Sequence, residues 1–570
     1  MRSWLGNNPL LHPLFGPVLL VAMILAVYYP ALFSGTHPID DPGIFSLYSV
    51  SPPLLKVLLP GSSYYYRPFV ELSFWLDNLL WGMEPRTMHL ESILVHCANT
   101  LLIYVLARKL SFSEGVTAVP LLTAALFAMH PLPVEAVSWI AGRTDLLLTF
   151  FVLFSLFFWL RWIVAPNWKD MLPALILFTA ALLTKETGLA FAPVILLVAV
   201  VQPGSATKRQ RSSVVAAMLL PVVTLLIISL VFKRGSSGLS RFLSLTDISY
   251  WQAFCDGLTA TGFYAKKLFF PFPLNFAIYD VQPLYALPGI ALFPLLWWAI
   301  KKDQIAGVFF VSAALCAMPA VLIAIKQVAW TSFAERYLYL PLAFFLLGIS
   351  ITVSKVWVCR KKYFFFAAVV VTLFFASVTL QRNILWADKL AFFQDAVAKS
   401  PRFGSVYYSL GGLLFKNGDI AKADEAFATA EQLNTRESMR YPIKAAIMGV
   451  MLAKDQYLGV KIYFNQLFRL KSDAPADFLE LLYKADSKRL EQLSDKDKAM
   501  LAADLIETLA LLNTKKPDPF WLYQSGRYAL MADDTARATD FFQRAYRQAP
   551  VDAHYRGAAQ KQLDRLHQNK

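Results

Sequence analysis

Charged residues are scarce in this sequence. They make up 16% of its 570 residues, whereas hydrophobic residues make up 57%. Soluble globular domains carry about 25% charged residues, so this composition argues against a protein that is soluble throughout. The sequence therefore predicts a polytopic membrane protein over its most apolar part.

Cysteine is scarce as well, with only four residues, Cys97, Cys255, Cys316 and Cys359. They are scattered along the chain, and three of them lie within or beside apolar runs. This pattern shows neither the spacing of a metal site nor a disulfide framework. We expect the cysteines to be small, buried, apolar side chains.

Acidic residues are fewer than basic ones, 39 against 54, which gives a formal net charge of +15. The basic residues form no long face with interleaved aromatics, so nucleic acid is not an expected partner. They gather in short connectors such as 208–211 and 360–362. Basic residues in short loops are typical of the cytoplasmic side of a membrane protein.

Apolar runs of membrane-spanning length recur up to about residue 380 and are missing from the rest of the chain. A span needs about twenty apolar residues. The first run is long for a signal peptide and lacks an A-x-A cleavage site, so we interpret it as a retained span. About eleven spans are predicted, near 14–33, 90–107, 116–130, 146–164, 171–184, 188–202, 213–232, 285–300, 304–325, 337–354 and 363–380.

These runs divide the chain into a membrane domain, 1–380, and a charged, alanine-rich helical domain, 381–570. The basic connectors predict a cytoplasmic N-terminus and an extracytoplasmic C-terminal domain. Segment 252–270 fits an interfacial amphipathic helix better than a span, because it carries Asp256, Lys266 and Lys267. The compact connectors suggest a bacterial inner membrane, with the C-terminal domain in the periplasm.

The C-terminal domain contains an internal repeat. Two segments share the small and apolar positions of a 34-residue tetratricopeptide repeat, whose small residues let two helices pack closely. The fold class predicted for the whole chain is therefore all-α, a membrane helical bundle followed by an α-solenoid, with 386–401 as the second helix of an earlier repeat. The aligned positions are Tyr407, Leu410, Gly411, Leu414, Gly418, Ala423, Phe427 and Ala430 against Leu522, Ser525, Gly526, Ala529, Asp533, Ala538, Phe542 and Ala545.

Charged and polar groups gather in the segments expected on the outer face. An ionised group inside a bilayer costs about 2.5–3.5 kcal/mol on insertion scales, so such groups usually face a cavity and serve a function. Salt-bridged interface anchors remain the alternative for each cluster taken singly. The five clusters are Asp40 with Asp41, Arg67 with His89 and His96, Glu135 with Arg143 and Asp145, Lys185 with Glu186, and Glu335 with Arg336.

The residue types leave several roles open. Asp40 and Asp41 could act as a general base, bind a cation or form a turn before Pro42. The histidines lack a third ligand for zinc. Glu135 could clamp Arg143, or Arg143 could be left free to hold a phosphate in bidentate fashion.

The order of these motifs resembles one known family. The pattern H-P-x-x-x-E-A-V-x-x-I-x-G-R-x-D at 130–145, the Asp40-Asp41 pair, Tyr66-Arg-Pro68, Leu183-Thr-Lys-Glu-Thr-Gly188 and Ala334-Glu-Arg-Tyr-Leu-Tyr-Leu-Pro341 are similar to motifs of the transmembrane and tetratricopeptide repeat-containing protein O-mannosyltransferases. These belong to the GT-C glycosyltransferases. Ser92 departs from the family's usual asparagine, which puts a polar role at that position in doubt.

The resemblance implies an inverting transfer of a mannose-like sugar from a polyprenyl-phosphate donor to an extracytoplasmic acceptor. The acceptor would be a protein Ser/Thr hydroxyl, or a glycan, presented through the repeat domain. Asp40 or Asp41 would be the base. The resemblance leaves the need for a divalent metal open; a metal, if required, would bind to Asp40 and Asp41. Arg143, Lys185 and Arg336 would hold the phosphate, with Arg67 and His89 also lining the pocket, while Glu135, Asp145, Glu186 and Glu335 would orient the cations.

Two other functions compete with this interpretation. A non-enzymatic scaffold for envelope or polysaccharide assembly would use the repeats alone, but it does not explain carboxylates and cations concentrated on one face. A transporter would be expected to show paired halves with broken helices, and the first 380 residues show no such symmetry.

Overall fold

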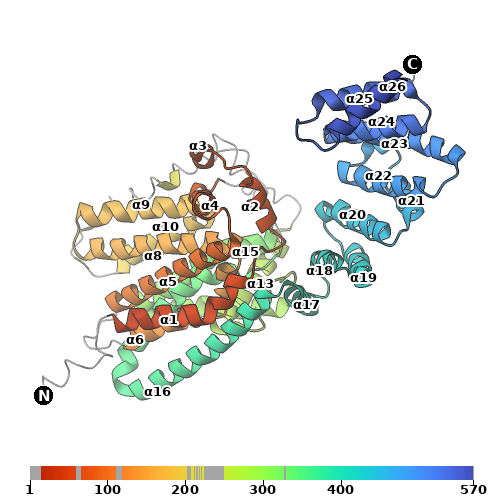
Figure 1. Ribbon diagram of the computed structural model, residues 1–570. Helices are drawn as coiled ribbons and strands as arrows, with labels where there is room; N and C mark the ends of the chain where they lie inside the picture. Colours follow the sequence, from red (N-terminus) through yellow and green to blue (C-terminus); the bar gives the residue numbers. More distant parts are fainter. Residues whose placement is uncertain are drawn as a thin grey trace. The chain divides into compact units, whose positions relative to one another are not determined.

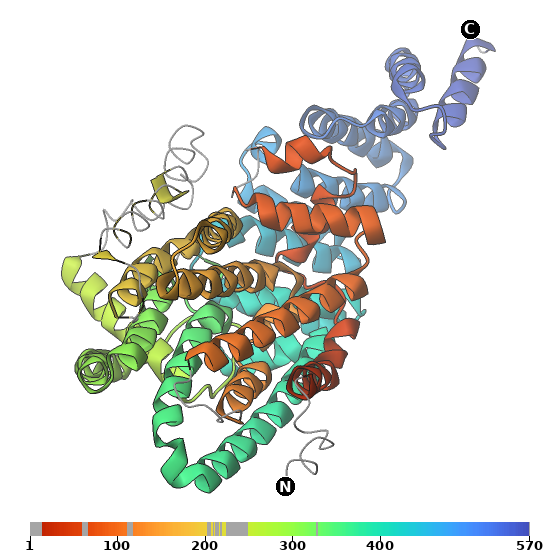
Figure 2. The ribbon, with the colours of Figure 1, turned by 90° about the vertical axis from the view of Figure 1, so that its left-hand side faces the viewer.

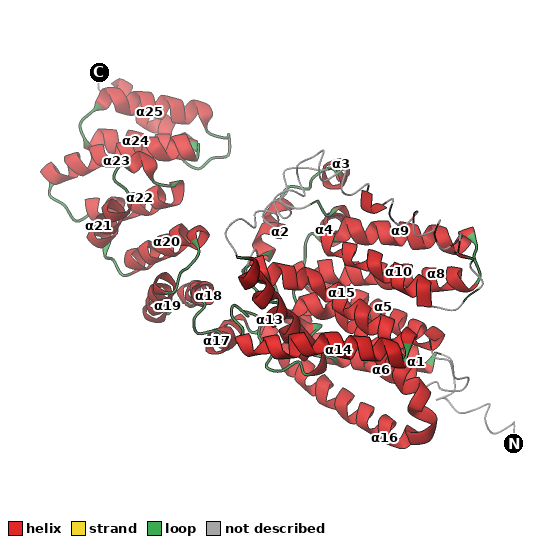
Figure 3. Ribbon diagram, turned by 180° about the vertical axis from the view of Figure 1, so that it is seen from behind, coloured by secondary structure: helices red, strands yellow, loops and turns green. Residues whose placement is uncertain are grey.

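The computed structural model describes residues 14–59, 66–110, 118–201, 249–326 and 329–568, with a few single positions between 202 and 248 (Figure 1). The predicted span at 213–232 lies largely outside these residues. Helices dominate the described ranges, as Figure 3 shows, and an isolated bridge between Ile278 and Phe333 is the β-type pairing found there. The all-α class is confirmed.

Seven helical segments of the described chain are long and apolar enough to cross a membrane. This is fewer than the predicted eleven. The first five, in sequence order, are α1 (Phe15–Tyr28) with η2 (Tyr29–Phe33), α5 (Pro85–Leu110), η3 (Ile140–Gly142) with α8 (Arg143–Val164), η5 (Pro283–Tyr285) with α14 (Ala286–Lys302), and α15 (Gln304–Lys326). The last two are the two halves of one long helix, which is formed by η6 (Glu335–Leu338) and α16 (Tyr339–Ala387).

Three predicted spans form shorter helices. They are α6 (Ala118–Met129), α9 (Trp168–Thr184), and η4 (Glu186–Ala190) continued by α10 (Phe191–Val201). A rise of 1.5 Å per residue makes α6 about 18 Å long, too short for a hydrocarbon core of about 30 Å. Composition marks these segments as apolar but does not specify the length of the helix that each one forms.

Helix α13 (Tyr250–Phe269) occupies the segment predicted to be an amphipathic helix. The Ser249 side chain caps it by accepting a hydrogen bond from the Gln252 N–H. The helix packs tightly against the start of α14. A Cβ atom added to Gly262 would come within 1.8 Å of the Tyr285 carbonyl oxygen, so this approach requires glycine. Its helical nature is confirmed, and its interfacial location stays a prediction.

Helix α16 runs without a break through the predicted connector 355–362. In Figure 2 its two halves form the arms of a V. The helix also continues past the last apolar run to Ala387, and Arg382 and Asn383 near its end are buried.

The compact membrane unit ends at Ser400, later than the predicted boundary at 380. It includes α17 (Lys389–Lys399), whose Phe392 and Phe393 pack against the ring of His37. The structure groups this helix with the membrane unit, and its interpretation as the second helix of a repeat stays a prediction.

The second unit, Pro401–Lys570, consists of successive helices. The two predicted repeats form the hairpins α18–α19 and α24–α25. In both hairpins, a glycine of the first helix faces a phenyl ring of the second. A Cβ atom added to Gly411 would lie 2.8 Å from the Phe427 ring, and one added to Gly526 would lie 2.7 Å from the Phe542 ring. The helices are α18 (Gly404–Lys416), α19 (Ile420–Gln432), α20 (Glu437–Ala453), α21 (Tyr457–Leu467), η7 (Lys471–Asp473), α22 (Ala476–Leu490), α23 (Asp495–Lys515), α24 (Pro519–Met531), α25 (Thr535–Gln548) and α26 (Arg556–Gln568).

Short helices connect the long ones in the segments predicted on the outer face. They carry most of the charged clusters singled out in the sequence. They are α2 (Asp41–Leu47), α3 (Leu54–Leu58), α4 (Pro68–Trp81) and α7 (Val134–Ser138), together with η3, η4 and η6.

Candidate functional site

The two adjacent aspartates at the start of α2 lie in different environments. Asp40 is the N-cap residue and its side chain is exposed, whereas Asp41 is fully buried. The backbone N–H of His37 donates a 2.6 Å hydrogen bond to Asp41 Oδ2. Burial raises the pKa of Asp41 to about 6, against the opposing effect of backbone N–H groups at His37 and Ala141. Asp40 is therefore the more accessible carboxylate of the pair.

Arg336 is the cation with the largest effect on the pKa of Asp40. Partial desolvation raises the pKa of Asp40, and the charges of Arg336 and Arg67 oppose that rise. The Arg336 side chain and backbone N–H both donate to the buried carboxylate of Glu135. Its guanidinium lies over two rings, 4.9 Å from the centroid of Trp139 and 4.8 Å from that of Tyr337. These contacts fix the cation beside the aspartates.

Two further cations join the same cluster from other elements. Arg67, just before α4, donates from Nε and Nη2 to the Glu186 carboxylate of η4, at 3.1 and 2.6 Å. Lys185 Nζ lies 2.7 Å from Asp145 Oδ1 and 5.3 Å from the Tyr337 ring centroid. Each of the three cations therefore has a carboxylate partner from a distant segment.

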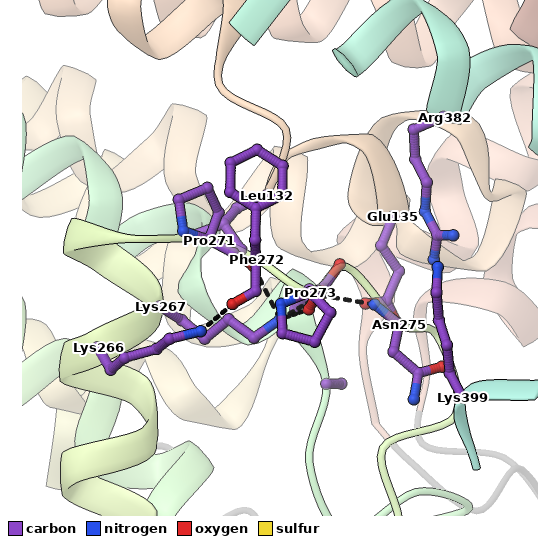
Figure 4. A network of polar contacts seen from close by, with 12 residues as sticks. Leu132, Glu135, Lys266, Lys267, Pro271, Phe272, Pro273, Asn275, Arg382 and Lys399 are labelled. Carbon is purple, nitrogen blue, oxygen red and sulfur yellow. Dashed lines mark hydrogen bonds and ion pairs between the residues drawn. The ribbon is translucent and has the colours of Figure 1, made fainter. Parts of the chain in front are cut away.

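The Glu335 carboxylate belongs to a second polar network, whose members Lys267 and Asn275 are labelled in Figure 4. It accepts from Lys267 Nζ at 2.7 Å and from the Asn275 N–H at 2.9 Å. Lys267 also donates to the carbonyl oxygens of Pro271 and Pro273. The network ties η6, and with it Arg336, to the 271–275 loop.

Arg143 lies in a buried ion-pair cluster. It is 2% exposed, and Nη1 lies 2.5 Å from Asp77 Oδ2 and 3.3 Å from Glu91 Oε2. Nη2 donates to the Met88 carbonyl oxygen at 2.9 Å. Of the two alternatives for Arg143, the clamp with Glu135 is not formed, because Glu135 pairs with Arg336 instead. A role for Arg143 in phosphate binding stays a prediction.

The histidines of α5 have protein partners. His89 Nε2 lies 2.9 Å from the Gly35 carbonyl oxygen, and His96 Nδ1 lies 2.7 Å from the Tyr339 hydroxyl. Over the described ranges, no group of three or more His, Cys, Asp or Glu side chains is placed to hold a metal ion. Asp40 and Asp41 thus offer two carboxylates without a third such ligand within the part of the chain that the structure describes.

Five residues around the cluster were not predicted as site residues: His37, Asp77, Trp139, Lys267 and Tyr337. Trp139 and Tyr337 lie inside the motifs already singled out, but aromatic residues are common in membrane helices and carried no separate signal. Lys267 was interpreted as an interface charge. Asp77 lies in a mainly apolar segment outside the five clusters, so only the fold reveals that it pairs with Arg143.

Residues 67–232 match the dolichyl-phosphate-mannose-protein mannosyltransferase domain family. This range holds Arg67, His89, Glu135, Arg143 and Lys185. Over this range the chain is similar to a mannosyltransferase family.

Three proteins that resemble the chain are named protein O-mannosyl-transferases. A Caenorhabditis elegans protein O-mannosyl-transferase, F38B6.6, is 25% identical over 391 residues, which cover 65% of this chain and 54% of the relative. Drosophila melanogaster Tmtc1 is 38% identical over 23% of this chain and 15% of its own length. Human TMTC2 is 29% identical over 34% of this chain and 21% of its own length. The chain thus matches about half of the nematode relative and far less of the others.

Proposed function

We propose that the protein is a membrane glycosyltransferase that moves a mannose-like sugar from a polyprenyl-phosphate donor to an extracytoplasmic acceptor hydroxyl, with inversion. The observation that carries this proposal is the exposed carboxylate of Asp40 beside Arg336 and Arg67. A base next to fixed cations suits a reaction in which a hydroxyl loses its proton while a phosphate leaves. The match to a mannosyltransferase domain and the similarity to proteins named protein O-mannosyl-transferases support the sugar and the reaction class.

In the proposed reaction, Asp40 takes the proton from the acceptor hydroxyl. The freed oxygen attacks C1 of the sugar from the face opposite the phosphate. The bond between C1 and the phosphate oxygen breaks, and its electron pair leaves with the polyprenyl phosphate. A single displacement of this kind inverts the configuration at C1.

Arg336, Arg67 and Lys185 stabilise the charge that develops on the leaving phosphate. Glu135, Glu186 and Asp145 hold these cations in place through the observed ion pairs. Because the cations are already fixed, they need little rearrangement when the charge appears, and such preorganisation is a main source of electrostatic catalysis. Arg336 and Arg67, which act directly on Asp40, are the principal phosphate ligands in this proposal.

Asp41 has a positioning role in this proposal. Its carboxylate is fully buried and accepts the backbone N–H of His37, so it shapes the loop that presents Asp40. A lipid-linked donor fits a site between short helices that connect apolar spans, since its phosphate would lie at headgroup level and its tail in hydrocarbon. The C-terminal helical unit would present the acceptor protein.

Sugar transfer by the full-length protein, measured from polyprenyl-phosphate mannose to an acceptor peptide in vesicles, tests the proposal. Asp40→Asn should reduce the rate by about 10²–10⁴-fold, the usual contribution of a general base. Asp495→Asn, on a fully exposed side chain of the C-terminal unit, is the matched control and should transfer normally. Normal transfer by both Asp40→Asn and Asp41→Asn would rule out this assignment and favour a scaffold function.

A further inference from the structure

The ring of His37 lies inside a box of five aromatic side chains. Its centroid is 5.1–5.5 Å from the centroids of all five rings. They come from the 139 and 276 connectors, the end of α16 and helix α17, and are Trp139, Phe276, Trp386, Phe392 and Phe393. The same residue donates its backbone N–H to Asp41, so the box adjoins the aspartate pair.

The polar atoms in and beside this box lack hydrogen-bond partners among the described residues. His37 is 6% exposed, yet neither of its ring nitrogens is bonded. The same holds for Nε1 of Trp139 and of Trp386 and for Oδ1 of Asp41. The indole of Trp139 lies close enough to Asp41 to lower the pKa of its carboxyl.

An imidazole in such a box is an unfavourable choice for packing alone. A buried donor or acceptor without a partner loses its interactions with water and gains none in return. A phenyl ring would fill a similar volume without that loss. The presence of His37 where phenylalanine would pack better indicates that its nitrogens serve a ligand and not the fold.

The charge of the ring defines the kind of ligand. Burial, together with the nearby positive charges of Lys389 and Arg336, lowers the pKa of His37 to about 3. The ring is therefore neutral at physiological pH, with one N–H donor and one acceptor nitrogen. A hydroxyl group both donates and accepts, so it matches a neutral imidazole better than a phosphate anion does.

We propose that the His37 box is a hydroxyl-binding subsite, in which the imidazole bonds a hydroxyl of the transferred sugar or of the acceptor beside Asp41. This inference rests on the proposed glycosyltransferase function. The surrounding rings suit a sugar, whose C–H faces pack on aromatic side chains while its hydroxyls find polar partners. The nitrogens are covered in this structure, so His37 or a neighbouring ring must turn as the substrate enters.

The test measures kcat and KM for His37→Phe, with the donor and the acceptor peptide varied in turn. We expect unchanged or higher thermal stability and a fall of about tenfold in kcat/KM, the value of one lost hydrogen bond. A rise in KM for the donor would assign the hydroxyl to the sugar, and a rise for the acceptor would assign it to the acceptor. His37→Gln keeps a donor and an acceptor and should recover part of the loss.

Unchanged kcat/KM for both substrates in His37→Phe would overturn the inference, because the nitrogens would then be dispensable. If His37→Phe does not fold, two other comparisons test the inference. Trp386→Phe removes an unpartnered N–H of the same box and keeps a ring, and His37→Gln is compared with His37→Ala. Normal kinetics in Trp386→Phe, together with equal kcat/KM in His37→Gln and His37→Ala, would also overturn the inference. Failure of the proposed function looks different, because the wild-type protein would then transfer no sugar.

Discussion

Arg143 illustrates at the residue scale how burial limits what a charged side chain can do. Its place in a polar motif between apolar segments suggested a phosphate ligand. Its guanidinium is instead surrounded by Asp77, Glu91 and the Met88 carbonyl oxygen, with the Phe74 ring 5.1 Å away. A buried charge that loses its partner is costly, so the ion pair holds α4, α5 and the start of α8 together.

Arg143→Met should therefore destabilise the protein by about 3–5 kcal/mol, because it leaves Asp77 as an uncompensated buried charge. Thermal unfolding in detergent measures the loss. The double variant Arg143→Met with Asp77→Asn should recover part of it, since the unpaired charge is then absent. A stable Arg143→Met protein with sharply weakened donor binding would contradict the structural role and support phosphate binding.

At the scale of elements, the glycines of the C-terminal hairpins set how closely the helices approach. Gly411 faces the Phe427 ring, and Gly526 faces the Phe542 ring at nearly the same distance. The repeat was predictable because small residues recur at fixed spacing in the sequence. The lengths of α6 and α10 could not be predicted, because a short apolar helix and a membrane span have the same local composition.

Gly411→Ala should destabilise the C-terminal unit by about 1–3 kcal/mol through overpacking against Phe427. The adjacent Gly412→Ala is the control: a Cβ atom there meets nothing within 4 Å, so alanine should be neutral or stabilise α18 by about 0.5–1 kcal/mol. Limited proteolysis of the full-length protein compares the two. Equal resistance to protease in both variants would contradict the close packing.

At the scale of the whole molecule, the orientation of the spans decides which side of the membrane carries the site and the C-terminal unit. The basic connectors predict that the N-terminus is cytoplasmic and that residues 401–570 are extracytoplasmic, in a bacterial inner membrane. A lipid-linked donor on the outer leaflet requires the same orientation. This prediction is separate from the chemistry of the site.

A phosphatase reporter fused after Lys570 should be active, because the enzyme folds only outside the cytoplasm. A fusion within the predicted cytoplasmic connector at Asp303 should be inactive. The opposite pair of results would place the candidate site on the cytoplasmic side and remove the proposed role of the C-terminal unit as presenter of an extracytoplasmic acceptor.

The sequence by itself determined the all-α class, most of the long apolar helices, the repeat hairpins and the charged clusters, because each depends on residues close together along the chain. Only the tertiary structure decided which charges pair. Glu135 and Arg336 are 201 residues apart, and Arg67 and Glu186 are 119 apart. It also separated exposed Asp40 from buried Asp41 and enclosed His37 in rings from distant segments. These outcomes depend on burial and long-range packing, which local composition and spacing do not specify.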